Sequence, residues 1–123
     1  MLVNFYTFEN MRKNDKKLDN QLRLELTDVC EVALKDVPGF QWLTHLVNYD
    51  NFPASLRIVC VFDTNESLDN YLISKSNAQL QTMIAAKLNS LGVKLKRIEK
   101  HVLFDTEENC DAQHKGNWAL RLK

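Results

Sequence analysis

The sequence has little glycine and little proline, and it carries no net charge. Only three glycines and two prolines occur in 123 residues. A glycine-rich phosphate loop and a dinucleotide-binding turn both need closely spaced glycines, and a serine-hydrolase elbow needs a glycine on each side of its serine. The sequence therefore excludes these motifs. Sixteen basic residues balance sixteen acidic ones, which removes any whole-protein electrostatic argument for binding nucleic acid or anionic lipid.

Long apolar runs are also missing, and cysteine is sparse. No stretch approaches the roughly 20 apolar residues of a membrane-spanning helix, and the first residues show no charged region that leads into an apolar run. The three cysteines, Cys30, Cys60 and Cys110, are odd in number and widely spaced, which is typical of reduced thiols. We therefore expect a cytoplasmic protein that does not bind a membrane.

The strongest structural pattern is the apolar run over residues 55–63. Ile58 and Cys60 fall on one face of the predicted strand, and Val59 and Val61 make the other face apolar as well. A strand that is apolar on both faces is usually central in its sheet, with other elements covering each side.

The other elements are placed by periodicity and by helix breakers. Leucines at helical spacing precede Pro38-Gly39, and the polar residues 74–77 predict a kink or two abutting helices in the second helical region. The expected order is helix, strand, strand, helix, strand, helix, at residues 14–36, 40–49, 55–63, 67–91, 97–105 and 106–114. The pattern leaves residues 118–122 open between strand and helix.

Two short sequences resemble each other where the second and third strands end. Residues 61–66 read VFDTNE and residues 103–108 read LFDTEE, so each strand ends in Asp-Thr and a helix follows. Strands of this kind are expected to be parallel neighbours joined by a right-handed crossover. The predicted fold class is α+β, a single domain with a small mixed β-sheet covered by helices.

The first ten residues differ in character from the rest of the chain. A strong helix signal begins shortly after Met11, and 123 residues fit one domain. We expect residues 1–10 to be an N-terminal extension and residues 11–123 to be the single domain, and a short extra strand is the alternative for residues 1–10.

Asp63 and Asp105 end two strands that are expected to be parallel. Open α/β sheets bind ligands at the carboxyl ends of their strands, and two carboxylates there could hold a divalent cation for phosphoester chemistry. Two carboxylates are too few to specify a metal site, so capping of the following helices is the favoured interpretation and a divalent-metal phosphoesterase is an alternative. His101, Cys110 and His114 contain only one close pair, whereas a structural zinc site needs four ligands.

Basic residues gather in two segments, at 12–23 and 87–100. Residues 85–98 partly match a helix-turn-helix with Gly92 in the turn, but Leu88 falls where a small residue belongs. A helix end followed by a basic strand is therefore the favoured structure there. A DNA- or RNA-associated transcriptional regulator remains an alternative, with phosphate contacts from Lys16, Lys17, Lys94, Lys96 and Arg97.

The leading functional prediction is a non-enzymatic binding or interaction module without a cofactor. The strand at 40–49 is expected at the edge of the sheet, and Trp42 and Trp118 are large side chains suited to an interface. For each tryptophan taken singly, packing in the core or at the sheet edge is the favoured interpretation. We expect a protein partner or self-association as a homodimer.

Three segments of the sequence resemble a small family of uncharacterised bacterial proteins, some of which carry the label Fis-family transcriptional regulator. The similarity lies in MRKNDKKLDN from Met11, GFQWLTH from Gly39 and VCVFDT from Val59. It covers most of residues 11–123 and implies a bacterial protein with a possible role in transcription. It supplies no catalytic residues.

Overall fold

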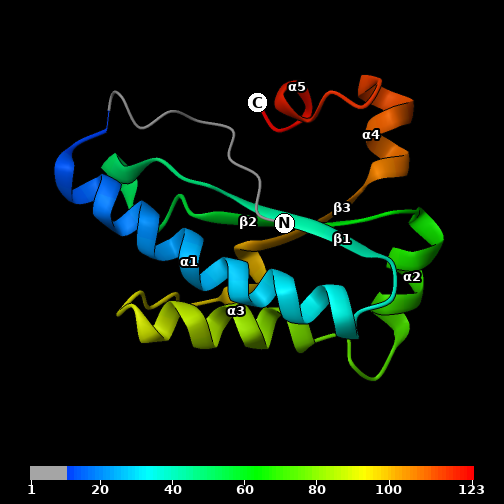
Figure 1. The fold of residues 1–123 in the computed structure, drawn as a ribbon, viewed down its shortest axis with the longest axis horizontal. Helices are drawn as coiled ribbons and strands as arrows, with labels where there is room; N and C mark the ends of the chain where they lie inside the picture. The colour runs from blue at the N-terminus through cyan, green and yellow to red at the C-terminus, as the bar shows by residue number, and fades with distance from the viewer. Residues whose placement is uncertain (1–10) are drawn as a thin grey trace.

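The computed structural model describes residues 11–123 and confirms a single α+β domain (Figure 1). The expected N-terminal extension, residues 1–10, lies outside the described residues. The elements are α1 (Lys13–Asp36), β1 (Phe40–Leu46), the 3₁₀ turn η1 (Tyr49–Asn51), β2 (Arg57–Phe62), α2 (Asn65–Ile73), α3 (Gln79–Ser90), the 3₁₀ turn η2 (Ile98–Lys100), β3 (Val102–Thr106), α4 (Glu107–His114) and α5 (Trp118–Arg121).

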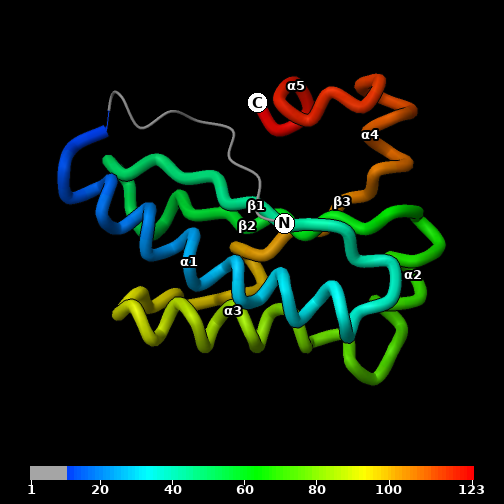
Figure 2. The backbone as a smooth tube through the Cα atoms, in the orientation of Figure 1, coloured from blue at the N-terminus to red at the C-terminus, as the bar shows by residue number. Residues whose placement is uncertain are grey.

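The sheet has the order β1-β2-β3, so the apolar strand β2 is central as expected. β1 pairs with β2 antiparallel as a hairpin, and β3 pairs with β2 parallel, which confirms the mixed sheet and the crossover (Figure 2). Residues paired across neighbouring strands share a face. One such row contains Trp42, Val61 and Asp105.

The main core lies between the sheet and two helices. α1 and α3 run side by side on one face of the sheet (Figure 1). The side chains that fill this space are fully buried: Leu22, Leu26, Leu43, Ile58, Cys60, Phe62, Leu80 and Ile84. On the opposite face Val59 and Val61 are also buried, which explains why β2 is apolar on both sides.

Two strands are shorter than the sequence pattern suggests. β1 ends at Leu46 rather than at residue 49, and β3 begins at Val102 rather than at residue 97. Both limits follow from β2, because Arg57 pairs with Leu46 and Ile58 pairs with Val102. Apolar residues beyond those points have no central strand to bond to, so the chain turns instead.

The second helical region consists of two helices, as the polar interruption predicts. Asn77 Nδ2 donates to Leu72 O at the end of α2, and Leu80 N donates to the hydroxyl oxygen of Tyr71 at the start of α3. For residues 118–122 the sequence pattern does not decide between strand and helix, and the structure has the short helix α5 there. Asn117 Oδ1 caps this helix by accepting from Leu120 N.

Candidate functional site

The five basic residues predicted to contact phosphate lie at one end of the molecule. α1 carries Lys16 and Lys17 in its first turns, and the loop after α3 carries the other three, at 94, 96 and 97. Both segments lie at the left in Figure 1. We call these residues the basic end: Lys16, Lys17, Lys94, Lys96 and Arg97.

The lysines of the basic end are not neutralised by neighbouring carboxylates. Within residues 11–123 none of them forms an ion pair, whereas Arg97 Nε lies 2.8 Å from Glu99 Oε1. Lys16 is half-buried and the other four are exposed. The positive charge is therefore available to an anionic partner.

The loop after α3 does not form the helix-turn-helix that residues 85–98 partly match. Gly92 ends α3 at a positive φ of 76°, and Val93 N donates back to Leu88 O. Residues 93–97 are a loop that leads into the short turn η2. They form neither a recognition helix nor the expected basic strand, because their strand partner in the sheet does not extend that far.

Segments rich in acidic residues lie at the other end of the molecule, at the right in Figure 1. That end contains the last turn of α1, the start of α2 and the helix α4. We call it the acidic end, formed by Asp36, Asp63, Glu66, Asp69, Glu107, Glu108 and Asp111. A chain with no net charge is therefore folded into a molecule with two ends of opposite charge.

Asp63 directly precedes α2, whose N-cap is the next residue, Thr64. Its Oδ1 accepts from Thr64 N at 2.7 Å, and Thr64 Oγ1 accepts from Ser67 N at 3.1 Å. A hydrogen bond from the Ser67 side chain, with further help from backbone N–H groups, lowers the pKa of Asp63 below its ordinary value. This arrangement is the capping role that the sequence favours.

Replacing Asp63 with asparagine should lower the free energy of unfolding by less than about 1 kcal/mol at neutral pH, because the carboxylate is largely solvated. A carboxyl with a depressed pKa in the folded state stabilises the fold above the ordinary pKa of 3.8. The difference from the wild type should therefore be constant above about pH 5 and shrink as pH falls further. Urea unfolding at several pH values measures it, and a difference that grows in acid would contradict the assignment.

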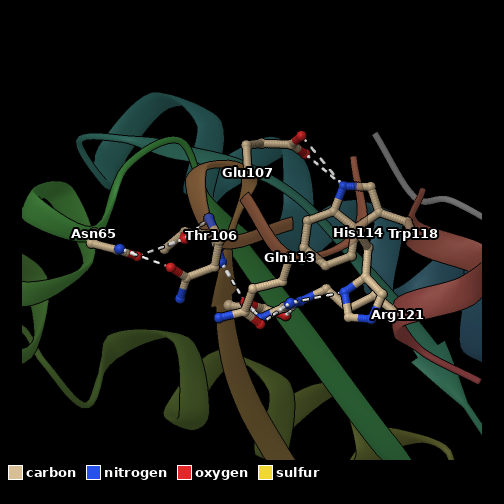
Figure 3. Close-up of polar contacts among 9 residues, drawn as sticks. Asn65, Thr106, Glu107, Gln113, His114, Trp118 and Arg121 are labelled. Carbon is tan, nitrogen blue, oxygen red and sulfur yellow. Dashed lines mark hydrogen bonds and ion pairs between the residues drawn. The ribbon is translucent and has the colours of Figure 1, made fainter. Parts of the chain in front are cut away.

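Asp105 is engaged by Arg121 from the C-terminal helix (Figure 3). Arg121 Nε lies 2.6 Å from Asp105 Oδ2, and Arg121 Nη2 lies 3.0 Å from Oδ1, so the pair is bidentate. Gln113 Oε1 and His114 Nδ1 accept from Nη1 of the same guanidinium. The Arg121 guanidinium thus already binds the Asp105 carboxylate, which the phosphoesterase alternative needs as a metal ligand.

Trp42 and Trp118 pack against each other within the chain. Their rings meet edge to face with centroids 4.8 Å apart, and both indole N–H groups donate to Glu107, at 2.6 Å from Trp42 and 3.2 Å from Trp118. Both side chains are half-buried. The contact fastens α5 to the sheet, and the two rings already have partners other than a second protein.

No group of three histidine, cysteine or acidic side chains within residues 11–123 is arranged to hold a metal ion. His101 lies before β3 and Cys110 lies on α4, at opposite ends of that strand. The three cysteines are free thiols and are buried.

A buried polar cluster joins α1 to the sheet, and the sequence analysis does not predict it. His45 Nε2 lies 2.8 Å from Asp19 Oδ1, and the hydroxyl of Tyr49 donates to the same oxygen at 2.6 Å. Asp19 is fully buried and His45 is 2% exposed. Burial and the neighbouring carboxylate raise the pKa of Tyr49, so it remains a hydrogen-bond donor. Asp19 lies three and seven residues before the core leucines Leu22 and Leu26, a spacing that places it on the buried face.

A groove beside the β1–β2 loop is a second feature that no sequence pattern predicts. We call it the hairpin groove; its volume is about 690 Å³. Its lining includes the apolar residues Leu46, Val47 and Leu56, and three residues that we call its basic side: Arg57, Lys100 and His101. Its basic residues come from the start of β2 and the start of β3, which only the folded sheet brings together.

None of the helices in residues 11–123 is long and apolar enough to cross a membrane. Comparison of the chain with protein-family models, with curated proteins and with solved structures gives no match.

Proposed function

We propose that the protein is a non-enzymatic binding module and that its basic end binds the phosphate backbone of a nucleic acid. The observation that carries this proposal is the set of four lysines without ion pairs within residues 11–123, gathered at one end of the molecule. Lysine and arginine bind phosphates without reading sequence, and the binding depends steeply on salt. Three reduced, buried thiols support a cytoplasmic location.

Binding to a fluorescein-labelled duplex DNA of about 20 base pairs should show this salt dependence. If all five side chains of the basic end contact phosphates, the logarithm of the association constant should fall with the logarithm of salt concentration with a slope of about −4.5. Replacing Lys94 and Lys96 with glutamine should reduce the slope by about 2. Fluorescence anisotropy between about 50 and 200 mM NaCl measures both quantities.

The matched control is the double variant Lys35→Gln/Lys75→Gln. These two lysines are exposed, form no ion pair within residues 11–123, and belong to the end of α1 and the α2–α3 loop, near the acidic end. The control removes the same amount of charge as Lys94→Gln/Lys96→Gln. Because its two lysines lie away from the basic end, it should leave the slope unchanged. A flat salt response in the wild type, or equal losses in both double variants, would rule out binding through the basic end.

Self-association is the second candidate function, and the charged ends favour it. Two copies placed side by side in antiparallel orientation bring the basic end of each against the acidic end of the other, which closes as a homodimer. Replacing Glu66 and Asp69 by glutamine and asparagine should abolish such a dimer in sedimentation equilibrium without weakening DNA binding. A monomer in the wild type at low salt would rule the dimer out.

A further inference from the structure

The backbone on both sides of Arg57 is bound to a single residue of the neighbouring strand segment, His101. His101 Nδ1 lies 2.6 Å from Leu56 O, and Ile58 N donates to His101 O at 2.7 Å. A carbonyl oxygen only accepts, so Nδ1 carries the proton and Nε2 is the remaining polar atom of the ring. Leu56 and Ile58 are fully buried, whereas Arg57 is exposed. Arg57, which lines the hairpin groove, is therefore held on a fixed backbone.

The loop that forms one rim of the groove is also held in place by its own hydrogen bonds. Ser55 Oγ accepts from Asn48 N at 2.9 Å and donates to Asn48 O at 2.7 Å. Asn48 Oδ1 in turn accepts from Asp50 N at 3.0 Å. A site formed before its ligand arrives loses less conformational entropy on binding.

The basic side of the groove keeps its charge largely unpaired, although Lys100 acts electrostatically on the neighbouring carboxylate of Glu99. Within residues 11–123 neither Arg57 nor Lys100 forms an ion pair, and the adjacent carboxylate of Glu99 is paired with Arg97. Arginine binds a phosphate with two parallel hydrogen bonds, and a lysine beside it adds a second full charge. The lining of the groove also includes the apolar side chains of Leu46 and Val47, which suit the sugar or base attached to a phosphate.

We propose that the hairpin groove is a binding site for a phosphomonoester, with Arg57 and Lys100 on the phosphate and His101 holding the backbone beside Arg57. The dianionic monoester at the end of a nucleic acid strand fits this charge better than the singly charged diesters within it. This inference rests on the proposed nucleic-acid function, and it identifies the strand terminus as the part of the nucleic acid that the groove binds. A free mononucleotide carries the same chemical group.

The test compares a duplex with phosphorylated 5′ ends with the same duplex carrying 5′ hydroxyls. We expect fluorescence anisotropy to show about tenfold tighter binding of the phosphorylated duplex, since a charge-assisted bidentate contact is worth at least that factor. Arg57→Gln and Lys100→Gln should each bring the ratio of the two affinities close to one. Lys94→Gln/Lys96→Gln should weaken both duplexes and keep the ratio, and Lys35→Gln/Lys75→Gln should change neither.

Titration of the ¹⁵N-labelled protein with AMP and with adenosine separates this proposal from the function on which it rests. Amide shifts around Arg57, Lys100 and His101 with AMP but not with adenosine, lost in Arg57→Gln, support the phosphomonoester site even if neither duplex binds. In that case the free mononucleotide is the ligand and the nucleic-acid function is wrong. Equal affinity for the two duplexes, together with the same response to AMP and adenosine, would overturn the proposal.

Discussion

Replacing Asp19 with alanine is expected to lower the free energy of unfolding by about 3–5 kcal/mol, the range seen when one member of a buried charged pair is removed. The carboxylate is fully buried and accepts from both Tyr49 and His45 through one oxygen. Alanine removes that acceptor and leaves a cavity between α1 and β1. The loss is a large part of the total stability of about 5–15 kcal/mol of a typical domain. Urea unfolding followed by circular dichroism measures it.

Asn20→Ala is the matched control, because Asn20 is the next residue of the same helix and is exposed. It should change stability by less than about 0.5 kcal/mol. Tyr49→Phe removes one donor from the same oxygen and should cost about 1–1.5 kcal/mol. The double variant Asp19→Ala/Tyr49→Phe should cost less than the sum of the two, because the residues share one hydrogen bond. Additive effects would show that Asp19 and Tyr49 do not act through a shared hydrogen bond. An Asp19→Ala cost close to that of Asn20→Ala would show that the cluster does not stabilise the fold.

The parts of the fold that the sequence predicts correctly depend on local chemistry. Val59 and Val61 make β2 apolar on both faces, and β2 is central in the sheet. The repeated Asp-Thr pairs end parallel strands, and each threonine caps the helix that follows: Thr64 Oγ1 accepts from Ser67 N and Thr106 Oγ1 accepts from Asn109 N. The strand pattern and the helix caps involve residues only two or three positions apart. They can therefore be recognised in the sequence without knowledge of the fold.

The ends of the edge strands follow a different rule. The aromatic and β-branched residues after Leu46 and before Val102 suit a strand, yet they lie outside the pairing with β2. A strand continues only while its neighbour offers backbone groups to bond. The length of β2 therefore limits β1 and β3, and their own side chains do not reveal that limit.

The candidate sites depend on contacts between residues far apart in the chain. Arg57 and His101 share a groove because β2 and β3 are paired, and Arg121 reaches Asp105 because α5 returns to the sheet. The sequence identifies Asp105 as a residue at a strand end but does not show that an arginine binds it. Asp19 is different, since its spacing from Leu22 already indicates a buried acidic residue and hence a buried partner.

Replacing Gly39 with alanine is expected to lower the free energy of unfolding by about 3 kcal/mol. Gly39 has a φ of +84°, and a Cβ there would lie 2.4 Å from Ser67 Cβ. A side chain at positive φ costs roughly 1–2 kcal/mol, and overpacking costs a further 1–3 kcal/mol. Since Gly39 O also accepts from Asp63 N at 2.9 Å, the added methyl would push the α1–β1 junction away from the start of α2.

Gly92→Ala separates these two causes, and thermal unfolding can compare the variants directly. Gly92 has a φ of +76°, but nothing lies within 4 Å of the position a Cβ would take. It should therefore cost only the roughly 1–2 kcal/mol of the backbone conformation. Adding Ser67→Gly to Gly39→Ala removes the two nearest atoms that the methyl meets and leaves Asp63 Oδ1 at 2.9 Å. The double variant should therefore cost less than the sum of its two single changes. Equal effects of Gly39→Ala and Gly92→Ala would mean that the contact between the α1–β1 junction and α2 is loose. A larger effect at Gly39 would mean that this contact fixes the position of the acidic end relative to the sheet.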